Sequence, residues 1–412
     1  MMATIDPVEL ACKLINCPSI TPEDAGAMDI IINLLEPLGF KCDLQKFNHT
    51  LNLYAKYGNT GNNLCFAGHT DVVPAHGQWS YNPFNAVIDN NILYGRGACD
   101  MKSAIAAFIA AIIKYLPDLR ESTPKLIQES REECSGASSG ACPLPLSNAE
   151  QGAGRARQRK QEGCLSILLT SDEEGSGKDG TVKMLEYLSG EKIDYAIVGE
   201  PTNPEVIGEM IKIGRRGSIN FKLTVKGTQG HVAYPLLADN PITKLVKILD
   251  ALTNLTLDDG NEFFDPSNLE ITSIDVANNI TNIIPEAATA AFNIRFNNIH
   301  TSKTLYNLVT TICSHNANNY ILEVISHSES FLNEPDDFCL NAQKVVAKLT
   351  GKKTELSTTG GTSDARFITN YTKVFEFGLI NKTAHKVDEN VNIADIYLLT
   401  DIYYELISEY FS

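Results

Sequence analysis

Apolar positions in the first 200 residues alternate between the 3.6-residue period of helices and short continuous runs typical of buried strands. Residues 6–9 (DPVE) carry an N-cap aspartate, a proline at the first helical position and a glutamate at the third, so we expect a helix to begin here. The expected helices of this part are 7–16, 25–38 and 101–116, and the expected strands are 41–47, 51–57, 63–67, 165–170 and 195–198. This alternation of strand and helix predicts an α/β fold class, with a central sheet flanked by helices.

Residues 217–329 follow a different order. The strand-like alternation of 218–225 is followed by an amphipathic helix at 241–252. Two further strands at 269–276 and 287–296, and a helix at 301–315, complete an α+β layer that we expect to hold four strands and two helices. The chain then returns with a helix near 337–349 and a final helix from Ala394. We therefore predict one domain from residues 1–216 and 330–412, with a second, 217–329, inserted into it.

Residues 119–163 interrupt the first domain. This stretch is rich in Ser, Gly, Ala and Pro, ends in a basic cluster at 155–160 and has no sustained apolar period. We expect a disordered surface insertion whose basic cluster is a solvated segment rather than an RNA-binding one.

Composition narrows the class of protein. The 34 basic and 50 acidic residues give a net charge of −16, which argues against a nucleic-acid-binding protein. The sequence contains no run of about 18 apolar residues, so we expect no transmembrane helix. The first residues, MMATIDPVEL, lack a signal-peptide pattern, and none of the ten cysteines forms a CxxC pair. We therefore expect reduced thiols and a cytoplasmic protein without a membrane partner.

Metal-ligating side chains occur where several predicted strands end. His69 follows the strand 63–67, Glu174 follows 165–170 and Glu200 follows 195–198, while Asp100 directly precedes the helix 101–116. Ligands gather at the carboxyl ends of strands in open α/β sheets. With His385, these side chains give two histidines and three carboxylates, which suit two divalent ions that share one carboxylate and one water. Zinc fits this ligand set, with cobalt as the alternative, and three carboxylates with one hydroxide would balance the charge of two Zn²⁺.

Two acidic residues beside these ligands suggest hydrolytic chemistry. Glu173 precedes Glu174, and adjacent side chains in an extended segment point in different directions. Glu173 is therefore our candidate general base for a metal-activated water. Asp71 lies two residues after His69, so it would share a face with that ligand and orient it.

Ordinary structural roles compete with each assignment. Asp100 could cap the helix that follows it, although capping is compatible with bridging two ions. Glu173 and Glu174 could form a solvated acidic turn, and His385 could lie in a surface loop. The place of His385 in the ligand set depends mainly on a family resemblance.

That resemblance is to the M20 family of co-catalytic metallopeptidases and deacylases. It is carried by the segments GHTDVVP (68–74), GRGACDMK (95–102), TSDEEG (170–175), VGEPT (198–202) and AHK (384–386). Five further segments resemble the succinyl-diaminopimelate desuccinylases within this family. These segments are KIGRRGSI (212–219), GTQGHVAYPLLADNP (227–241), GNEFF (260–264), NIIPE (282–286) and TTGGTSDARF (358–367). The resemblance covers nearly the whole chain apart from the insertion.

The resemblance implies a zinc-peptidase-like catalytic domain with a mixed central sheet, and an inserted domain that mediates homodimerisation. It implies hydrolysis of N-succinyl-LL-2,6-diaminopimelate to succinate and LL-2,6-diaminopimelate, a step in bacterial synthesis of lysine and cell-wall precursors. His231 would reach the partner subunit's active site and stabilise the oxyanion. The residues that match substrate-contacting positions are Arg215, Ser218, Tyr234, Asn282, Arg295, Gly361 and Thr362. Thr281 stands where relatives often carry asparagine, which puts any contact from that position in doubt.

Three alternatives remain open at this point. The chain could be another M20 amidohydrolase, such as an acetylornithine deacetylase or an aminoacylase. It could also be a catalytically impaired homologue that serves as a binding protein, although neither a ligand nor the base is missing. A third reading is a product made non-functional by the insertion at 119–163.

Overall fold

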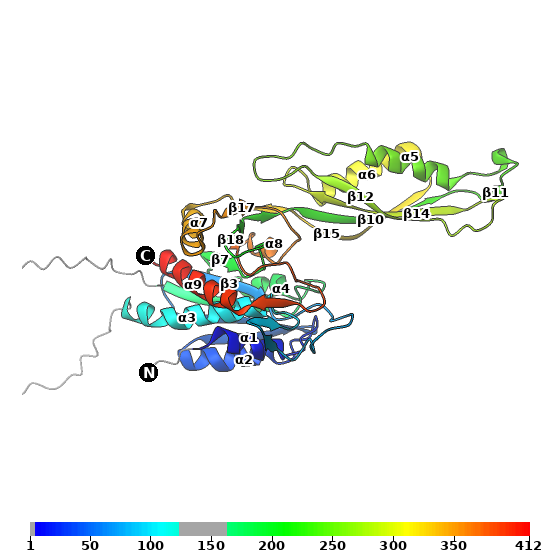
Figure 1. The fold of residues 1–412 in the computed structure, drawn as a ribbon. Helices are drawn as coiled ribbons and strands as arrows, with labels where there is room; N and C mark the ends of the chain where they lie inside the picture. Colours follow the sequence, from blue (N-terminus) through cyan, green and yellow to red (C-terminus); the bar gives the residue numbers. More distant parts are fainter. Residues whose placement is uncertain (1–4, 123–162) are drawn as a thin grey trace, which may run out of the picture.

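The computed structural model describes residues 5–122 and 163–412, so nearly all of the predicted insertion lies outside the described residues. An eight-stranded mixed sheet forms the larger part of the fold, with the strand order β1-β2-β6-β3-β7-β18-β8-β17 (Figure 1). Its strands are β1 (Lys41–Phe47), β2 (Thr50–Tyr57), β3 (Asn62–His69), β6 (Gly163–Thr170), β7 (Tyr195–Val198), β8 (Met210–Lys212), β17 (Glu355–Ser357) and β18 (Lys373–Glu376).

The centre of this sheet is parallel. β3 pairs in parallel with β6 on one side and β7 on the other, and β18 continues the parallel set beside β7. β6, β3 and β7 are almost wholly buried, because helices cover both of their faces. Their carboxyl ends therefore open at one edge of the sheet.

Helices pack on both faces of the sheet. One face carries α1 (Pro7–Ile15), α2 (Ala27–Leu35), α3 (Lys102–Ser122), α7 (Asp337–Thr350) and α9 (Ile393–Tyr410), whose apolar residues form one core with Leu64 and Phe66 of β3. The other face carries α4 (Thr181–Tyr187) and α8 (Ala365–Ile368), which pack against Cys65 and Ala67 of the same strand. Successive side chains of β3 point to opposite faces of the sheet and so contribute to both cores. The predicted α/β class is confirmed.

The predicted N-terminal helix is confirmed in its details. Asp6 caps α1 by accepting hydrogen bonds from the backbone N–H groups of Val8 and Glu9. The predicted helix 25–38 is shorter than expected: α2 is followed by the 3₁₀ turn η1 (Glu36–Leu38), and Gly39 ends it in the left-handed conformation.

The helix predicted over 101–116 is longer than the pattern suggested. α3 continues through Pro117 to Ser122. Leu116 and Leu119 are both buried, so the apolar stripe continues beyond the proline. This packing outweighs the hydrogen bond that the proline removes.

A small sheet that the sequence did not reveal lies at the carboxyl edge of the main sheet. It has the order β19-β5-β4, with β4 (Val87–Asp89), β5 (Ile92–Tyr94) and β19 (Asn390–Asn392). Strands of three residues are too short to show an alternating pattern. Pairing of β5 with β19 brings the segment after residue 94 beside the segment before residue 390.

A second, four-stranded sheet extends away from the first (Figure 1). Its order is β12-β14-β10-β15, from β10 (Gly217–Lys226), β12 (Asn268–Asp275), β14 (Ala287–Phe296) and β15 (Tyr320–Ser328). Helices α5 (Pro241–Thr253) and α6 (Ser302–Asn316) cover one face, as predicted for this segment. A two-stranded ribbon of β11 (Gly230–His231) and β13 (Ile283–Ile284), followed by the 3₁₀ turn η2 (Pro235–Leu237), lies at the far end.

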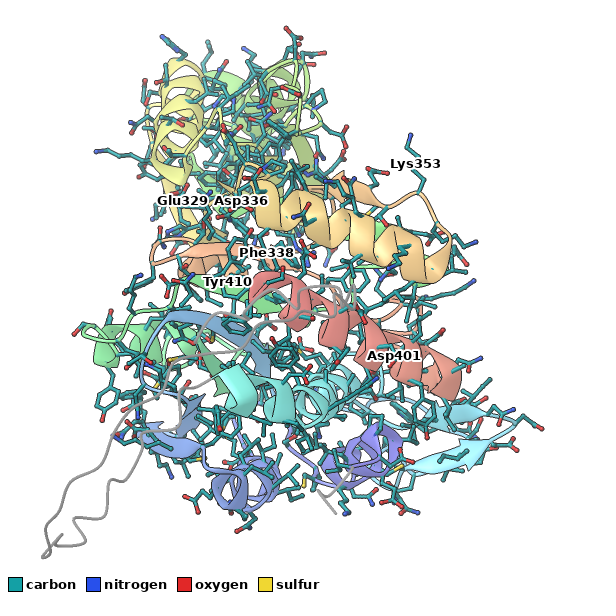
Figure 2. All side chains as sticks on the ribbon, turned by 90° about the vertical axis from the view of Figure 1, so that its left-hand side faces the viewer. Glu329, Asp336, Phe338, Lys353, Asp401 and Tyr410 are labelled. Carbon is teal, nitrogen blue, oxygen red and sulfur yellow. The ribbon has the colours of Figure 1, made fainter. Side chains whose placement is uncertain are left out.

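The two parts are joined by a two-stranded ribbon of β9 (Gly214–Arg215) and β16 (Phe331–Leu332). Beyond this ribbon the chain returns to the first sheet through α7 and α9. Figure 2 shows Phe338 of α7 and Tyr410 of α9 at the junction of these helices, and their ring centroids are 4.9 Å apart. Phe338 also packs edge-on against Tyr195 of β7, which fixes the returning segment to the main sheet.

Among the described residues, no helix combines the length and apolar character that crossing a membrane requires.

The stacked pair Phe66 and Phe108 lies at the centre of the contact between β3 and α3 in the larger core. Both rings are fully buried, and their centroids lie 4.3 Å apart between β3 and α3. We predict that Phe108→Ala lowers the free energy of unfolding by about 3–5 kcal/mol, because it removes apolar contacts and leaves a cavity. Urea unfolding followed by circular dichroism measures this loss.

Lys114→Ala is the matched control on the same helix. Lys114 pairs with Asp401 on the surface, and exposed ion pairs contribute about 0–1 kcal/mol. Equal destabilisation by the two substitutions would contradict the packing argument.

Candidate metal centre

Three neighbouring strands deliver acidic and imidazole side chains to the same edge of the sheet. β3 ends at His69, β6 ends three residues before Glu173, and β7 ends two residues before Glu200. Because the strand order is β6-β3-β7 and both pairings are parallel, these carboxyl ends lie side by side. The side chains that we predicted as ligands on these strands therefore lie together at one edge of the sheet.

Asp100 and His385 reach the same place through the small sheet. Asp100 lies in the segment between β5 and α3, and His385 lies in the segment before β19. The His385 backbone has a positive φ of 61°.

The five predicted ligands converge. Asp100 Oδ1 is 3.2 Å from His69 Nε2, and Asp100 Oδ2 is 3.2 Å from His385 Nε2. His69 Nε2 is also 3.7 Å from Glu200 Oε1, and His385 Nε2 is 2.8 Å from Glu174 Oε1. Asp100 therefore stands between two sets, one with His69 and Glu200 and the other with His385 and Glu174.

These spacings fit metal ligands. Two donors that each lie about 2.0–2.1 Å from one tetrahedral zinc ion are roughly 3.3 Å apart. The observed separations of 2.8–3.7 Å bracket this value on both sides of Asp100. The Asp100 carboxylate has one oxygen for each set. Among the described residues, no backbone N–H of α3 donates a hydrogen bond to it, so it does not cap the helix. The donor set thus fits two divalent ions.

Burial makes the site strongly dependent on compensating charge. Burial lowers the pKa of His69, but the Asp100 carboxylate and then Glu200 outweigh it and raise the pKa overall. Hydrogen bonds to Asp100 and Glu174 raise the pKa of His385 to about 10. Burial, with the neighbouring Asp100 charge, raises the pKa of Glu200. Clustered carboxylates of this kind are stabilised by positive charge, which divalent cations supply.

Asp71 contacts both His69 and the acidic turn, although not through the shared strand face that its spacing suggested. The strand ends at His69, and the Nδ1 atom of His69 lies 2.8 Å from the backbone carbonyl oxygen of Asp71. The Asp71 carboxylate is 3.7 Å from that nitrogen and instead accepts hydrogen bonds from the backbone N–H groups of Glu173 and Glu174, at 3.3 and 3.1 Å. One residue thus fixes both the His69 ring and the acidic turn.

Glu173 lies on the inner side of this turn. One ligand atom each of Glu173, His69 and Glu200 lie within 4.8 Å of one another. Glu174 points to His385, so the two adjacent carboxylates face different partners. Burial and the Glu200 charge raise the pKa of Glu173 well above its usual range.

Several predicted substrate residues lie at the junction of the two sheets. Arg215 in β9 is buried, and its Nη1 atom lies against Gly360, one residue before Gly361. The Thr362 hydroxyl is 3.0 Å from that of Ser328, which pairs with Ser218 in β10. Arg295 is the partner of Ser218 on the neighbouring strand β14.

The remaining predicted residues are remote from this junction. His231 is exposed on β11, and Tyr234 and Asn282 lie in the same terminal ribbon. His231 Nδ1 accepts a hydrogen bond from the backbone N–H of Ala233 at 3.0 Å. Figure 1 places β11 at the opposite end of the second sheet from the main sheet, so these residues do not join the metal centre of their own chain.

Glu389 is an important residue that the sequence did not reveal. Its fully buried carboxylate accepts hydrogen bonds from the N–H groups of Gly97, Cys99 and Asp100 at 3.0–3.1 Å, and from Arg96 Nη1 at 2.8 Å. Arg96 also donates to the carbonyl oxygens of Lys386 and Pro74. This buried pair therefore links the segments that carry Asp71, Asp100 and His385. In the sequence, only its position four residues after His385, in TAHKVDE (383–389), indicated that Glu389 lies near the site.

Glu376 is the second such residue. It ends β18, is fully buried, and accepts hydrogen bonds from Arg215 Nε and Nη2 and from the Ser363 hydroxyl. The Arg215 fork that the sequence assigned to a substrate carboxylate is thus held by Glu376, and Nη1 has no acceptor among the described residues.

Comparisons with known proteins assign both parts of the fold to one family. Residues 65–152 match the sequence pattern of peptidase family M20/M25/M40, and residues 213–321 match the peptidase dimerisation domain. Curated relatives named succinyl-diaminopimelate desuccinylase include those of Ehrlichia chaffeensis, 44% identical over 99% of both chains, and Caulobacter vibrioides, 48% identical over 99% of this chain and 97% of the relative.

Solved structures share the fold at lower identity. An M20 family metallo-carboxypeptidase from Sulfolobus solfataricus superposes with a TM-score of 0.75 at 17% identity, covering 98% of this chain and 99% of the other. The Bacillus subtilis YXEP protein, a dinuclear metal-binding peptidase from the M20 family, gives a TM-score of 0.66 at 13% identity, with 98% and 97% covered. The chain therefore belongs to the M20 family of metal-dependent hydrolases and combines its catalytic fold with its dimerisation domain.

Proposed function

We propose that this enzyme hydrolyses N-succinyl-LL-2,6-diaminopimelate to succinate and LL-2,6-diaminopimelate. The observation that carries the proposal is the convergence of His69, Asp100, Glu174, Glu200 and His385 in two ligand sets that share Asp100. The choice of acyl group follows the names of relatives that match nearly the full chain at 44–48% identity.

Two divalent ions would be held at this centre. His69 and Glu200 would hold one, His385 and Glu174 the other, and Asp100 both. When bound, the ions supply Lewis acidity toward the scissile carbonyl and lower the pKa of a coordinated water. Zinc suits the two imidazoles and three carboxylates, with cobalt as the alternative.

Glu173 would be the general base. Its carboxylate lies beside His69 and Glu200 but is not needed in either ligand set. Its raised pKa, caused by burial and by Glu200, favours holding a proton once one is transferred. Glu173 would take the proton of the attacking water and return it to the leaving amine.

The segment at the junction of the sheets would bind the substrate. Arg215 and Arg295 would attract its carboxylates, and Ser218 and Thr362 would supply hydroxyl groups. Gly361 lies in an exposed turn where the backbone is open to a ligand.

A second copy of the chain would complete the site as a homodimer. His231, Tyr234 and Asn282 lie at the far end of the second sheet and cannot reach their own metal centre in this arrangement. Leu236 and Leu237 next to them are 97% and 79% exposed, as expected for a surface that meets another subunit. His231 of the partner subunit would donate a hydrogen bond to the oxyanion. Residues 217–329 would thus form the dimerisation domain, and 1–216 with 330–412 the catalytic domain.

We also place the enzyme in the cytoplasm. Eight cysteines in the described residues are free thiols, which is typical of a reducing compartment.

The test of the substrate is turnover of N-succinyl-LL-2,6-diaminopimelate against N-acetylornithine, with and without a chelator. We expect kcat/KM to be at least about 10²-fold higher for the succinylated substrate, because only it presents the succinyl carboxylate to the arginines. Chelation should abolish turnover, and added zinc should restore it. A preference for acetylornithine would favour another amidohydrolase of the family.

The general base is tested by Glu173→Gln. This change keeps the size of the side chain but removes the proton acceptor, so we expect kcat to fall by about 10²–10⁴-fold or more. Metal content measured by atomic absorption should stay at two ions per chain. Wild-type turnover with both ions bound would disprove the assignment.

The ligand sets are tested by His385→Ala. His385 stands only in the set with Glu174, so the variant should lose about one metal equivalent and retain the ion held by His69 and Glu200. Val387→Ala, at an exposed position of the same segment, is the matched control and should keep both ions. Two tightly bound ions in His385→Ala would contradict the proposed set.

The contribution of the partner subunit is tested by complementation. His231→Ala and Glu173→Gln should each be nearly inactive alone. After unfolding and refolding as an equal mixture, we expect about one quarter of wild-type activity, because half of the dimers are mixed and each of these has one complete site. Absence of recovery in dimers shown to be mixed would mean that His231 acts within its own chain or not at all.

A further inference from the structure

The loop 258–264, which contains the GNEFF segment, contacts both parts of the fold. It lies between α5 and β12 of the second part (Figure 1). Leu257, just before it, packs against the core of the second sheet, whereas Phe263 packs against the larger core of the first. A few residues of chain thus connect the two cores at a point outside the connecting ribbon.

Two polar side chains brace this loop from within. The Asp258 carboxylate accepts a hydrogen bond from Asn297 Nδ2 at 2.6 Å, which attaches the start of the loop to the segment after β14. Asn261 Oδ1 accepts from the backbone N–H groups of Phe263 and Phe264 at 3.0 and 3.1 Å. Side chains of this kind fix a turn by satisfying its backbone donors. The loop is therefore a preformed projection of the second part.

The tip of the loop is attached where the two parts meet. The Thr358 hydroxyl donates a hydrogen bond to the carbonyl oxygen of Phe263, and Thr358 is 4% exposed. Its methyl group lies 3.3 Å from the position that a Cβ on Gly214 would take, which places Thr358 against β9. Thr358 directly follows β17, so it joins the main sheet, the connecting ribbon and the loop.

The connecting ribbon by itself offers little resistance to bending. β9 and β16 pair over two residues only, Arg215 with Phe331 and Gly214 with Leu332. An isolated two-stranded ribbon is at best marginally stable in water. A contact beside this ribbon therefore restrains the angle between the two sheets better than the ribbon does alone.

This angle decides where the far end of the second sheet lies. His231 is on β11, at the end of that sheet which is distant from the joint (Figure 1), so a small rotation at the joint becomes a large displacement of the imidazole. In a homodimer the same rotation would move His231 relative to the partner's metal centre. A misplacement of about 1 Å can cost roughly 10²-fold in rate.

We propose that Phe263 and Thr358 are positioning residues, and that the loop 258–264 is a strap that restrains the joint and so positions His231 for the partner's site. Phe263 contributes apolar packing, and its carbonyl oxygen with the Thr358 hydroxyl contributes a hydrogen bond across the joint. The kinetic part rests on the proposed function, because it needs His231 to act on the oxyanion. Restraint of the joint does not depend on that function.

The first test is hydrogen–deuterium exchange of the metal-loaded enzyme, which requires no substrate. Thr358→Val keeps the branched shape and removes the donor, and Phe263→Ala removes the packing. We expect the amides of β9 and β16 to exchange at least about tenfold faster in both variants, while those of β3 exchange as in the wild type. Thr358→Ser keeps the hydroxyl and should restore slow exchange. Glu262→Ala, at an exposed position of the same loop, should leave it unchanged.

The second test is steady-state kinetics. We expect Thr358→Val to lower kcat about tenfold, with KM changed less than about threefold and two ions still bound, because a misplaced His231 stabilises the transition state less. In a His231→Ala background, Thr358→Val should lower the remaining kcat by less than about twofold, since both changes remove the same interaction.

Wild-type exchange of the β9 and β16 amides in both variants would overturn the strap. An additive loss of kcat in the His231→Ala background, or a rise of KM alone, would mean that Thr358 acts on the adjoining turn of its own chain, and would overturn the positioning of His231. If the wild type does not hydrolyse the succinylated substrate, the proposed function fails. The exchange experiment then still decides whether the strap exists.

Discussion

Burial of several carboxylates around two imidazoles is the constraint on which this structure depends. Asp100, Glu173, Glu174 and Glu200 meet at one edge of the sheet, and Asp100 and Glu200 are each only 9% exposed. Such a cluster repels itself unless positive charge is brought to it. The two histidines supply hydrogen-bond partners, and divalent ions would supply the charge. The positions of the donors, rather than their number, then decide whether two ions fit.

Backbone hydrogen bonds hold these donors in place. The Asp71 carboxylate accepts hydrogen bonds from the acidic turn, and Glu389 accepts them from the backbone N–H groups of Gly97, Cys99 and Asp100. Both supports are themselves buried carboxylates, with Arg96 as the partner of Glu389. His69, Glu174 and Asp100 are thus held by Asp71 and Glu389, which preorganises this part of the site before any ion or substrate is bound.

Positive charge lies on the other side of the same edge. Arg215 binds Glu376, Lys212 Nζ donates to the Thr359 hydroxyl, and both cations adjoin the turn 359–361. A substrate that carries carboxylates would therefore lie between the acidic centre, with its divalent ions, and the basic side chains of Arg215 and Lys212. The terminal ribbon with His231 lies at the opposite end of the second sheet, so a complete site in our proposal combines a rigid centre from one chain with an exposed histidine from another.

The sequence by itself determined much of this arrangement. Regular apolar periods located the long helices and the central strands, and polar residues at the ends of those strands indicated His69, Glu174 and Glu200. The family segments added His385, whose own surroundings in the sequence are not distinctive.

Only the tertiary structure decided how the remaining residues act. The strands of the β19-β5-β4 sheet have three residues each, which is too few to show a period, yet their pairing brings Asp100 to His385. Glu389 and Glu376 look like ordinary acidic residues in the sequence, because their roles come from partners up to 293 residues away. A local pattern reports which face of an element is buried, whereas the pairing of charges depends on contacts between distant segments, and these exist only once the chain is folded.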